Sequence, residues 1–169
     1  MYKAVSKYFR EVFFTFMNNV IYLPYFLEDP KFIYNKLLKL KKSQKFSKLF
    51  NYLKIQNHPE TTNSIKHQNL IKHVKNTLLN KNLISKKNNF SIFIGCSSAA
   101  IEALVRGVKV IHISKEPILE IYSNLWNFLD LEEIYPGIFT YNLKKNISKN
   151  NILKINQINK KKILNKYFY

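Results

Sequence analysis

Residues 90–113 read FSIFIGCSSAAIEALVRGVKVIHI, and they predict a buried strand, a tight turn, a short helix and a second buried strand. The first strand, 90–94, is almost wholly apolar, which is typical of a strand covered on both faces of a parallel sheet. Gly95 permits a sharp turn, because glycine adopts backbone angles that other residues avoid. Gly107 is expected to end the helix ahead of the strand at 108–113. The stretch therefore predicts an α/β fold.

The segments that precede this stretch repeat the alternation of strand and helix. Short strands are expected at 20–23 and 52–56. Asp29 should cap a helix that begins at Pro30, and a second helix is expected over roughly 66–80. Short links join these strands and helices. The four strands should therefore lie parallel in one sheet with helices on both faces, which is a Rossmann-like three-layer arrangement.

The two ends of the chain differ in character from this central part. Residues 1–18 predict a helix, which we interpret as a connection from a domain outside this chain. Toward the other end, 118–129 looks helical and 137–141 strand-like. Residues 143–169 form a Lys- and Asn-rich segment that ends in a predicted helix. The Rossmann-like domain is therefore expected to span residues 19–142.

The chain has a formal net charge of +18, from 28 Lys and Arg against 10 Asp and Glu. Only Arg10 and Arg106 are arginines, whereas proteins that recognise nucleic acids commonly use guanidinium groups for bidentate contacts. Lys and Asn have AT-rich codons and are abundant, so base composition explains much of the charge. We expect a solvated Lys-rich surface and no nucleic-acid partner. Attraction to phosphorylated substrates or to the anionic inner membrane is the alternative.

Cysteine usage and hydropathy favour a cytoplasmic protein. The single cysteine, Cys96, excludes a disulfide framework and cannot assemble a thiolate metal site, so no metal cofactor is expected. The apolar stretch at 12–26 is interrupted by polar residues and falls short of the roughly 20 residues that a membrane span requires. Glu11 directly precedes this stretch and no small-residue cleavage site appears, so a signal peptide is not expected.

The turn after the strand at 90–94 carries the strongest chemical signal. Ser97 and Ser98 stand at the start of the predicted helix, where unpaired backbone N–H groups and the helix dipole favour an anion. Glu102 lies one turn further on the same helical face, placed to accept a hydrogen bond from a ribose hydroxyl. A single serine would be explained as a helix cap. The whole turn, at the carboxyl end of a buried strand, favours a phosphate site.

A second signal ends the strand expected at 52–56. His58 follows this strand and can donate a hydrogen bond to a phosphate oxygen, while Pro59 makes the turn rigid. Because the carboxyl ends of parallel strands meet at one edge of the sheet, we expect His58 to approach Ser97 and Ser98 closely enough to hold one phosphate.

This pattern resembles the C-terminal domain of GT-B glycosyltransferases. It consists of a strand ending in His58-Pro59, a strand about forty residues later ending in Ser97-Ser98, and Gly-x-x-Val-Ile at 107–111. It is similar to bacterial sialyltransferase-like and capsule or surface-polysaccharide enzymes, and in style to teichoic-acid polymerases. The resemblance implies one half of a GT-B fold. In it, His58, Ser97 and Ser98 hold the phosphate of a nucleotide-sugar donor, with a CMP-linked donor favoured. Pro59, Gly95 and Glu102 are the weaker nucleotide-binding candidates, with Glu102 on the ribose.

The resemblance also implies a second domain. Members of the family have an N-terminal Rossmann-like domain that binds the glycan acceptor and supplies the catalytic acid or base, and 169 residues leave no room for it. We therefore expect a fragment, a subunit or an inactive remnant without catalytic residues of its own. Two alternatives stay open. One is a nucleotide-sugar epimerase-like domain, whose Asp-Ser-Gly-Gly turn is replaced here at 96–99. The other is a non-catalytic basic protein that binds nucleic acid or membrane.

The remaining candidate residues carry weaker signals. His67 and His73 are six residues apart, share no helical face, and are expected on the surface. His112 alternates within a buried strand and is expected to be a hydrogen-bonded core residue. Cys96 has no evident partner base, which argues against a thiol nucleophile. Trp126 is interpreted as a packing residue.

Overall fold

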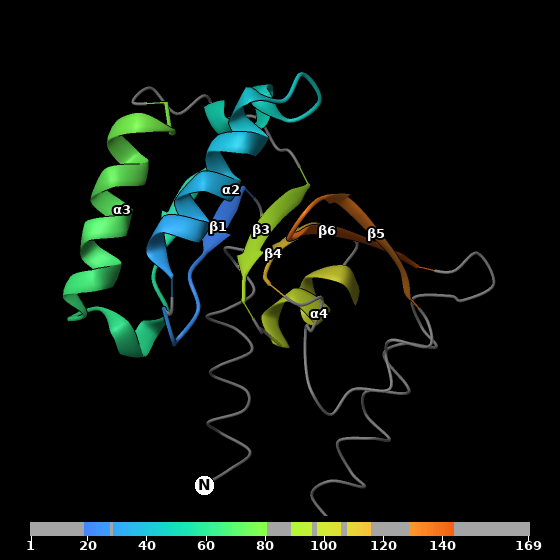
Figure 1. Cartoon of the computed structure of the whole chain (residues 1–169). Helices are drawn as coiled ribbons and strands as arrows, with labels where there is room; N and C mark the ends of the chain where they lie inside the picture. The colour runs from blue at the N-terminus through green and yellow to red at the C-terminus, as the bar shows by residue number, and fades with distance from the viewer. Residues whose placement is uncertain are drawn as a thin grey trace, which may run out of the picture.

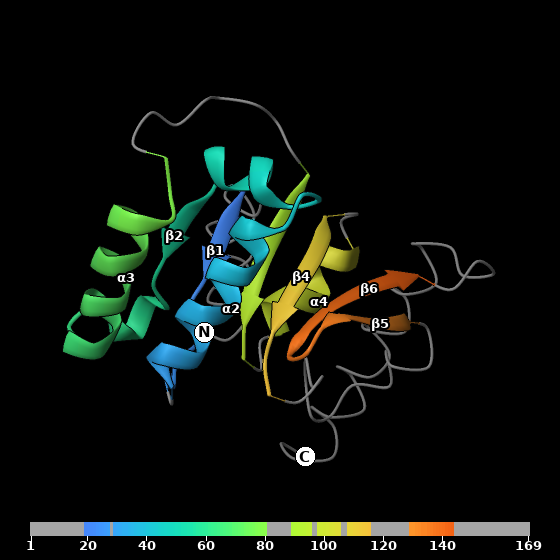
Figure 2. The same ribbon diagram turned by 45° about the horizontal axis from the view of Figure 1, so that its top comes forward.

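The computed structural model describes residues 19–27, 29–80, 89–95, 98–105, 108–115 and 129–143. Its strands are β1 (Val20–Tyr22), β2 (Lys54–Gln56), β3 (Phe90–Ile94), β4 (Lys109–Ile113), β5 (Leu129–Tyr135) and β6 (Ile138–Leu143). Its helices are α2 (Pro30–Lys42), α3 (Ile65–Thr77) and α4 (Ser98–Val105), with 3-10 turns η1 (Ser47–Asn51) and η2 (Pro59–Thr61). The strands form one sheet, with α2 and α3 on one face and α4 on the other (Figures 1 and 2). The fold is therefore α/β, with three layers.

The sheet has the strand order β2-β1-β3-β4-β6-β5. β1 pairs in parallel with both β2 and β3, and β3 pairs in parallel with β4. The prediction that these four strands point the same way is confirmed. The connection through α2 leads from β1 to β2, and the connection through α4 leads from β3 to β4 in the opposite direction along the sheet. The order therefore reverses between β1 and β3, at what is called a topological switch point.

The alternation of side chains along the strands separates two packing layers. Ile92 and Ile94 of β3 belong to the main apolar cluster beneath α2 and α3, whereas Phe93, between them, faces the α4 side. Both covering helices present a buried stripe with spacings of three and four residues. The buried residues are Ile33, Leu37 and Leu40 of α2, and His67, Leu70 and Val74 of α3.

The start of α2 depends on a side-chain cap. The Oδ1 atom of Asp29 accepts a hydrogen bond from the backbone N–H of Phe32 at 2.9 Å, and Pro30 occupies the first helical position, as predicted. Asp29→Ala should lower the free energy of unfolding by about 1 kcal/mol, because it leaves that N–H without its acceptor. Asp29→Asn keeps a side-chain oxygen and should be nearly neutral. Thermal unfolding of both variants measures the difference, and equal losses would contradict this role for the cap.

The far side of the sheet is antiparallel, so the expectation of a wholly parallel sheet is wrong. β4 pairs antiparallel with β6, and β6 pairs antiparallel with β5. The reason is the connection Pro136-Gly137, in which Gly137 has φ +72°. Proline followed by a glycine of positive φ is typical of a type II turn, and a link this short can join only antiparallel strands. The sheet is therefore mixed.

Several expected helices fall outside the described residues. These are the helix at 1–18, the terminal helix and most of the helix expected at 118–129. The last residue of that range, Leu129, begins β5. The strand-like signal at 137–141 corresponds to β6.

Candidate functional site

Four strand ends define one edge of the sheet, because β1 to β4 are parallel. Tyr22 pairs with both Gln56 and Phe93. Tyr22, Gln56 and Phe93 therefore form one row across the sheet, and Pro24, His58 and Gly95 each follow their member of this row by two residues. Adjacent strands are about 4.8 Å apart, so the backbones of His58 and Gly95 are separated by about 10 Å, and the turn after β1 lies between them.

The turn after β1 lies beside the turn after β3. A Cβ atom placed on Gly95 would lie 3.4 Å from the Cβ of Pro24. Gly95 has φ +68°, a conformation that other residues adopt with strain, which explains the glycine that the sequence places there. The two turns therefore meet at the switch point between β1 and β3.

His58 caps the 3-10 turn η2, which begins at Pro59. The Nδ1 atom of His58 accepts a hydrogen bond from the N–H of Glu60 at 3.3 Å, so in the neutral ring Nε2 carries the proton and can donate it. The ring also lies edge-to-face with the ring of Tyr25, at a centroid distance of 5.4 Å. His58 is half-buried at the carboxyl end of β2, where the sequence places it.

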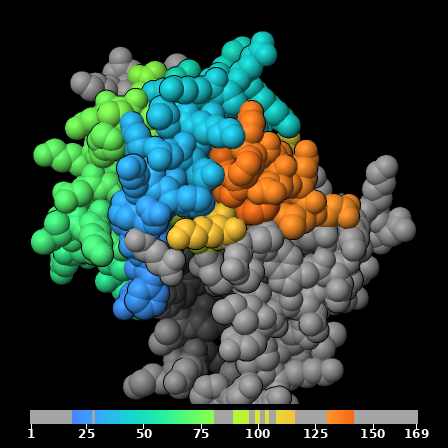
Figure 3. All heavy atoms as spheres, viewed as in Figure 1, coloured from blue at the N-terminus to red at the C-terminus, as the bar shows by residue number. Residues whose placement is uncertain are grey.

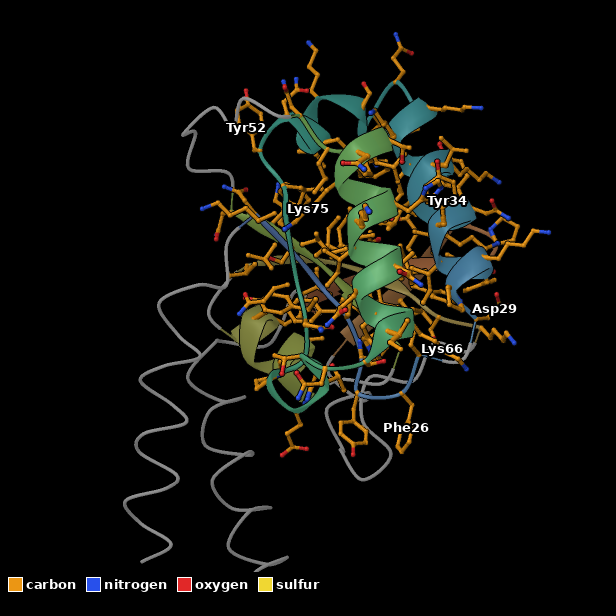
Figure 4. All side chains as sticks on the ribbon, turned by 90° about the vertical axis from the view of Figure 1, so that its left-hand side faces the viewer. Phe26, Asp29, Tyr34, Tyr52, Lys66 and Lys75 are labelled. Carbon is orange, nitrogen blue, oxygen red and sulfur yellow. The ribbon has the colours of Figure 1, made fainter. Side chains whose placement is uncertain are left out.

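Two exposed aromatic rings stand beside His58. Tyr25 and Phe26 are 47% and 76% exposed, and their rings meet edge-to-face at 4.6 Å. Figure 4 shows Phe26 beyond the N-terminal start of α3, at the strand-end edge of the molecule. Single exposed apolar side chains are ordinary on protein surfaces, but two large rings that lie next to each other are typical of a binding surface. These two rings were not predicted as part of a site, although two aromatic residues directly after Pro24 were the available signal in the sequence.

A cavity of about 320 Å³ opens at this edge, within the size range of small-molecule sites. Lys115 contributes a positive charge at its rim, and the end of β4 lies between the start of α2 and the β5–β6 hairpin in Figure 3. The lining residues are Pro24, Tyr25, Phe26, Asp29, Phe32, Ile33, Ile94, Gly95, Ile113, Ser114 and Lys115.

A larger cavity of about 420 Å³ lies elsewhere, on the outer side of α3. It is lined by Asn57, Thr62, Gln68, Ile71, Lys72, Lys75 and Asn76. None of these residues belongs to the turns after β1, β3 or β4. The smaller cavity is the better candidate, because ligands of open α/β sheets bind where the strand order reverses.

The serine turn is described only in part. Ser98 is the first residue of α4, so the helix begins where the sequence predicts. Cys96 and Ser97 lie outside the described residues, as do the side chains of Ser98 and Glu102. The strand ends thus bring His58, Pro59, Gly95 and the start of α4 to one edge. That His58, Ser97 and Ser98 together bind one phosphate stays a prediction.

His67 is buried, so its expected surface position is wrong. Only 3% of the residue is exposed, and its ring nitrogens lie 2.8 Å from Ser64 Oγ and 2.9 Å from the carbonyl oxygen of Pro24. Its spacing to Leu70 and Val74 on the buried stripe of α3 was the overlooked signal. His73 is exposed and lies against the ring of Tyr34, as expected of a surface residue.

His112 is fully buried, and both its ring nitrogens have partners, as predicted. Nε2 donates to the carbonyl oxygen of Gly95 at 2.9 Å, and Nδ1 accepts from the hydroxyl of Tyr141 at 2.8 Å. Burial lowers the pKa of His112 to about 4, because the cation would lose its hydration; the hydrogen bond to Gly95 opposes this shift. Burial also raises the pKa of Tyr141. His112 is therefore neutral at pH 7.

Two further features of the described residues concern metal binding and membrane spanning. Within them, no group of three His, Cys, Asp or Glu side chains is arranged to hold a metal ion. No helix in the same part of the chain combines the length and apolar character needed to cross a bilayer.

Comparison of the chain with protein-family models, curated proteins and solved structures gave no match. The function must therefore be inferred from the residues and their placement.

Proposed function

We propose that the carboxyl edge of the sheet binds the nucleotide of a nucleotide-sugar, and that the chain is the donor-binding domain of a GT-B-type glycosyltransferase. The observation that carries this proposal is the position of the 320 Å³ cavity at the β1/β3 switch point. Pro24, Tyr25 and Gly95 line the cavity, while the turn with His58 and the turn that leads from Gly95 to α4 lie on either side of the turn after β1.

The phosphate would lie between these two turns. α4 begins at Ser98, so the backbone N–H groups of its first turn have no partners within the helix and attract an anion. The Nε2–H of His58 adds a side-chain donor from the neighbouring strand end, and the ammonium of Lys115 adds positive charge at the rim. In this arrangement Ser97 and Ser98 contribute hydroxyl donors, and Glu102 accepts from the ribose.

The aromatic rim favours a ligand that contains a base. The exposed rings of Tyr25 and Phe26 border the cavity, and stacking of a base on an aromatic ring contributes about 1–3 kcal/mol. A sugar phosphate alone would leave these rings in water. A nucleotide therefore fits the edge better than a simple phosphorylated sugar, and the resemblance to sialyltransferase-like enzymes favours CMP.

The reaction in this proposal is an inverting sugar transfer without a metal. Oriented donors stabilise the charge that develops on the departing nucleotide phosphate. The glycan acceptor and the catalytic acid or base come from an N-terminal domain or partner chain, and the Lys-rich surface allows peripheral contact with the inner membrane.

Calorimetric titration with CMP, CDP and UDP tests the proposal. We expect the wild type to bind one of them and His58→Ala to bind it about ten- to a hundredfold more weakly, because a hydrogen bond to a charged group contributes about 1.5–3 kcal/mol. Ser97→Ala and Ser98→Ala should each lose only about 1 kcal/mol, since the backbone donors remain. His73→Ala, on the exposed face of α3, is the matched control and should bind like wild type.

The outcome that would place the site elsewhere is equal affinity of the wild type and all three site variants. Loss of affinity in the His73→Ala control to the same extent would show a general effect of histidine removal.

A further inference from the structure

We propose that His67 and His112 are positioning residues that hold the two walls of the candidate cavity, each by one hydrogen bond to the backbone carbonyl of a turn residue. The Nε2 atom of His67 lies 2.9 Å from the carbonyl oxygen of Pro24, and that of His112 lies 2.9 Å from the carbonyl oxygen of Gly95. Pro24 and Gly95 both line the cavity. The effect on ligand binding rests on the proposed function, whereas the effect on the turns does not.

The hydrogen-bond partners fix the same tautomer in both rings. A backbone carbonyl can only accept, so Nε2 carries the proton in His67 and in His112. Nδ1 is then an acceptor in each ring, with a hydroxyl as its partner. That hydroxyl belongs to Ser64, one residue before α3, for His67, and to Tyr141 of β6 for His112. Each histidine thus ties its turn to a second element of secondary structure.

The two histidines approach the edge from opposite faces of the sheet. His67 belongs to the buried stripe of α3, which packs over the face that α2 also covers. His112 lies among side chains of the opposite layer, with its ring 6.1 Å from that of Phe139. Since Pro24 lies within contact range of a side-chain position at Gly95, the two bonds hold a single pair of neighbouring turns from both sides.

Within the part of the chain that the structure describes, the turn after β1 has few other hydrogen bonds to fix it. Proline has no N–H, so the ladder on this side of β1 ends with the bond from Leu23 N–H to the carbonyl of Gln56. The exposed rings of Tyr25 and Phe26 follow at once. Binding sites need their contact groups held to within about 0.5 Å, and supporting hydrogen bonds from residues behind the site provide that precision.

Amide hydrogen exchange can separate positioning from general stability. His67→Phe keeps a ring but removes the donor. It should raise exchange at Leu23, which precedes Pro24 and whose N–H is bonded to the carbonyl of Gln56, about two- to tenfold, the ratio expected for one neutral hydrogen bond. His112→Phe should do the same at Gly95, whose N–H is bonded to the carbonyl of Ile113. The Gln variants place an amide N–H near the former Nε2 position and should restore the wild-type rates. Exchange at Ile92, in the centre of β3, should change in none of them.

Nucleotide affinity is measured on the same variants and should fall about two- to tenfold with Phe but not with Gln. His73→Phe is the control on α3 and should match wild type. If a Phe variant does not fold, Asn takes its place, since its shorter amide does not reach the carbonyl. Gln variants that exchange as fast as the Phe or Asn variants would overturn the proposal, as would unchanged exchange at both turns. If the Gln variants restore the wild-type exchange rates but the wild-type chain binds no nucleotide, the proposed function is refuted and the positioning role stands.

Discussion

Lowering the pH from 7 to 4 is expected to reduce the free energy of unfolding by about 3 kcal/mol through His112 alone. Burial lowers the pKa of this residue in the folded chain from 6.5 to about 4. Below pH 6.5 His112 binds a proton in the unfolded chain but stays neutral in the folded chain. The free energy of unfolding therefore falls as the pH falls. The loss is complete only below pH 4, where His112 is protonated in both states. Each unit of pKa difference corresponds to about 1.4 kcal/mol.

Urea unfolding at intervals between pH 7 and pH 4 measures this slope. His112→Gln keeps a donor for the carbonyl of Gly95 but cannot titrate, so its stability should change less over this interval. His73→Phe removes an exposed histidine and should keep the wild-type slope. Identical slopes for the wild type and His112→Gln would mean that His112 does not hold its pKa below the ordinary value.

The parallel part of the sheet was predictable because its signals are local. The strands at 90–94 and 108–113 are apolar runs bounded by Gly95 and Gly107, and they need no distant contact to be recognised. β5 was not predictable in this way. Its sequence contains three acidic residues, Asp130, Glu132 and Glu133, and it becomes a strand by pairing with β6. Its formation depends on a tertiary contact more than on its own hydropathy.

The edge of the candidate site was predictable for the same topological reason. Once His58 and Gly95 follow parallel strands, they must reach one edge of the sheet. The roles of His67 and of the ring pair after Pro24 depend on how α3 packs beside the turn after β1. The six-residue spacing between His67 and His73 was considered only as a metal-binding pattern. It gives no information on how α3 packs.

Truncation of Phe50 is expected to cause one of the largest losses of stability among the described residues. It is 1% exposed and belongs to the main apolar cluster, in the 3-10 turn η1 between α2 and β2. Phe50→Ala should reduce the free energy of unfolding by about 3–5 kcal/mol, from lost burial and the cavity left behind. Domains are stable by about 5–15 kcal/mol, so this variant approaches unfolding.

Two further variants keep the Phe50 measurement interpretable. Phe50→Leu retains most of the side-chain volume and should lose only about 1–1.5 kcal/mol, so it stays folded if the alanine variant does not. Phe26→Ala removes the same side chain from a position that is 76% exposed and should change stability by no more than about 0.5 kcal/mol. The midpoints of urea unfolding at pH 7 rank the stabilities of these three variants. Equal losses for Phe50→Ala and Phe26→Ala would show that η1 does not pack into the core, because only burial distinguishes the two phenylalanines.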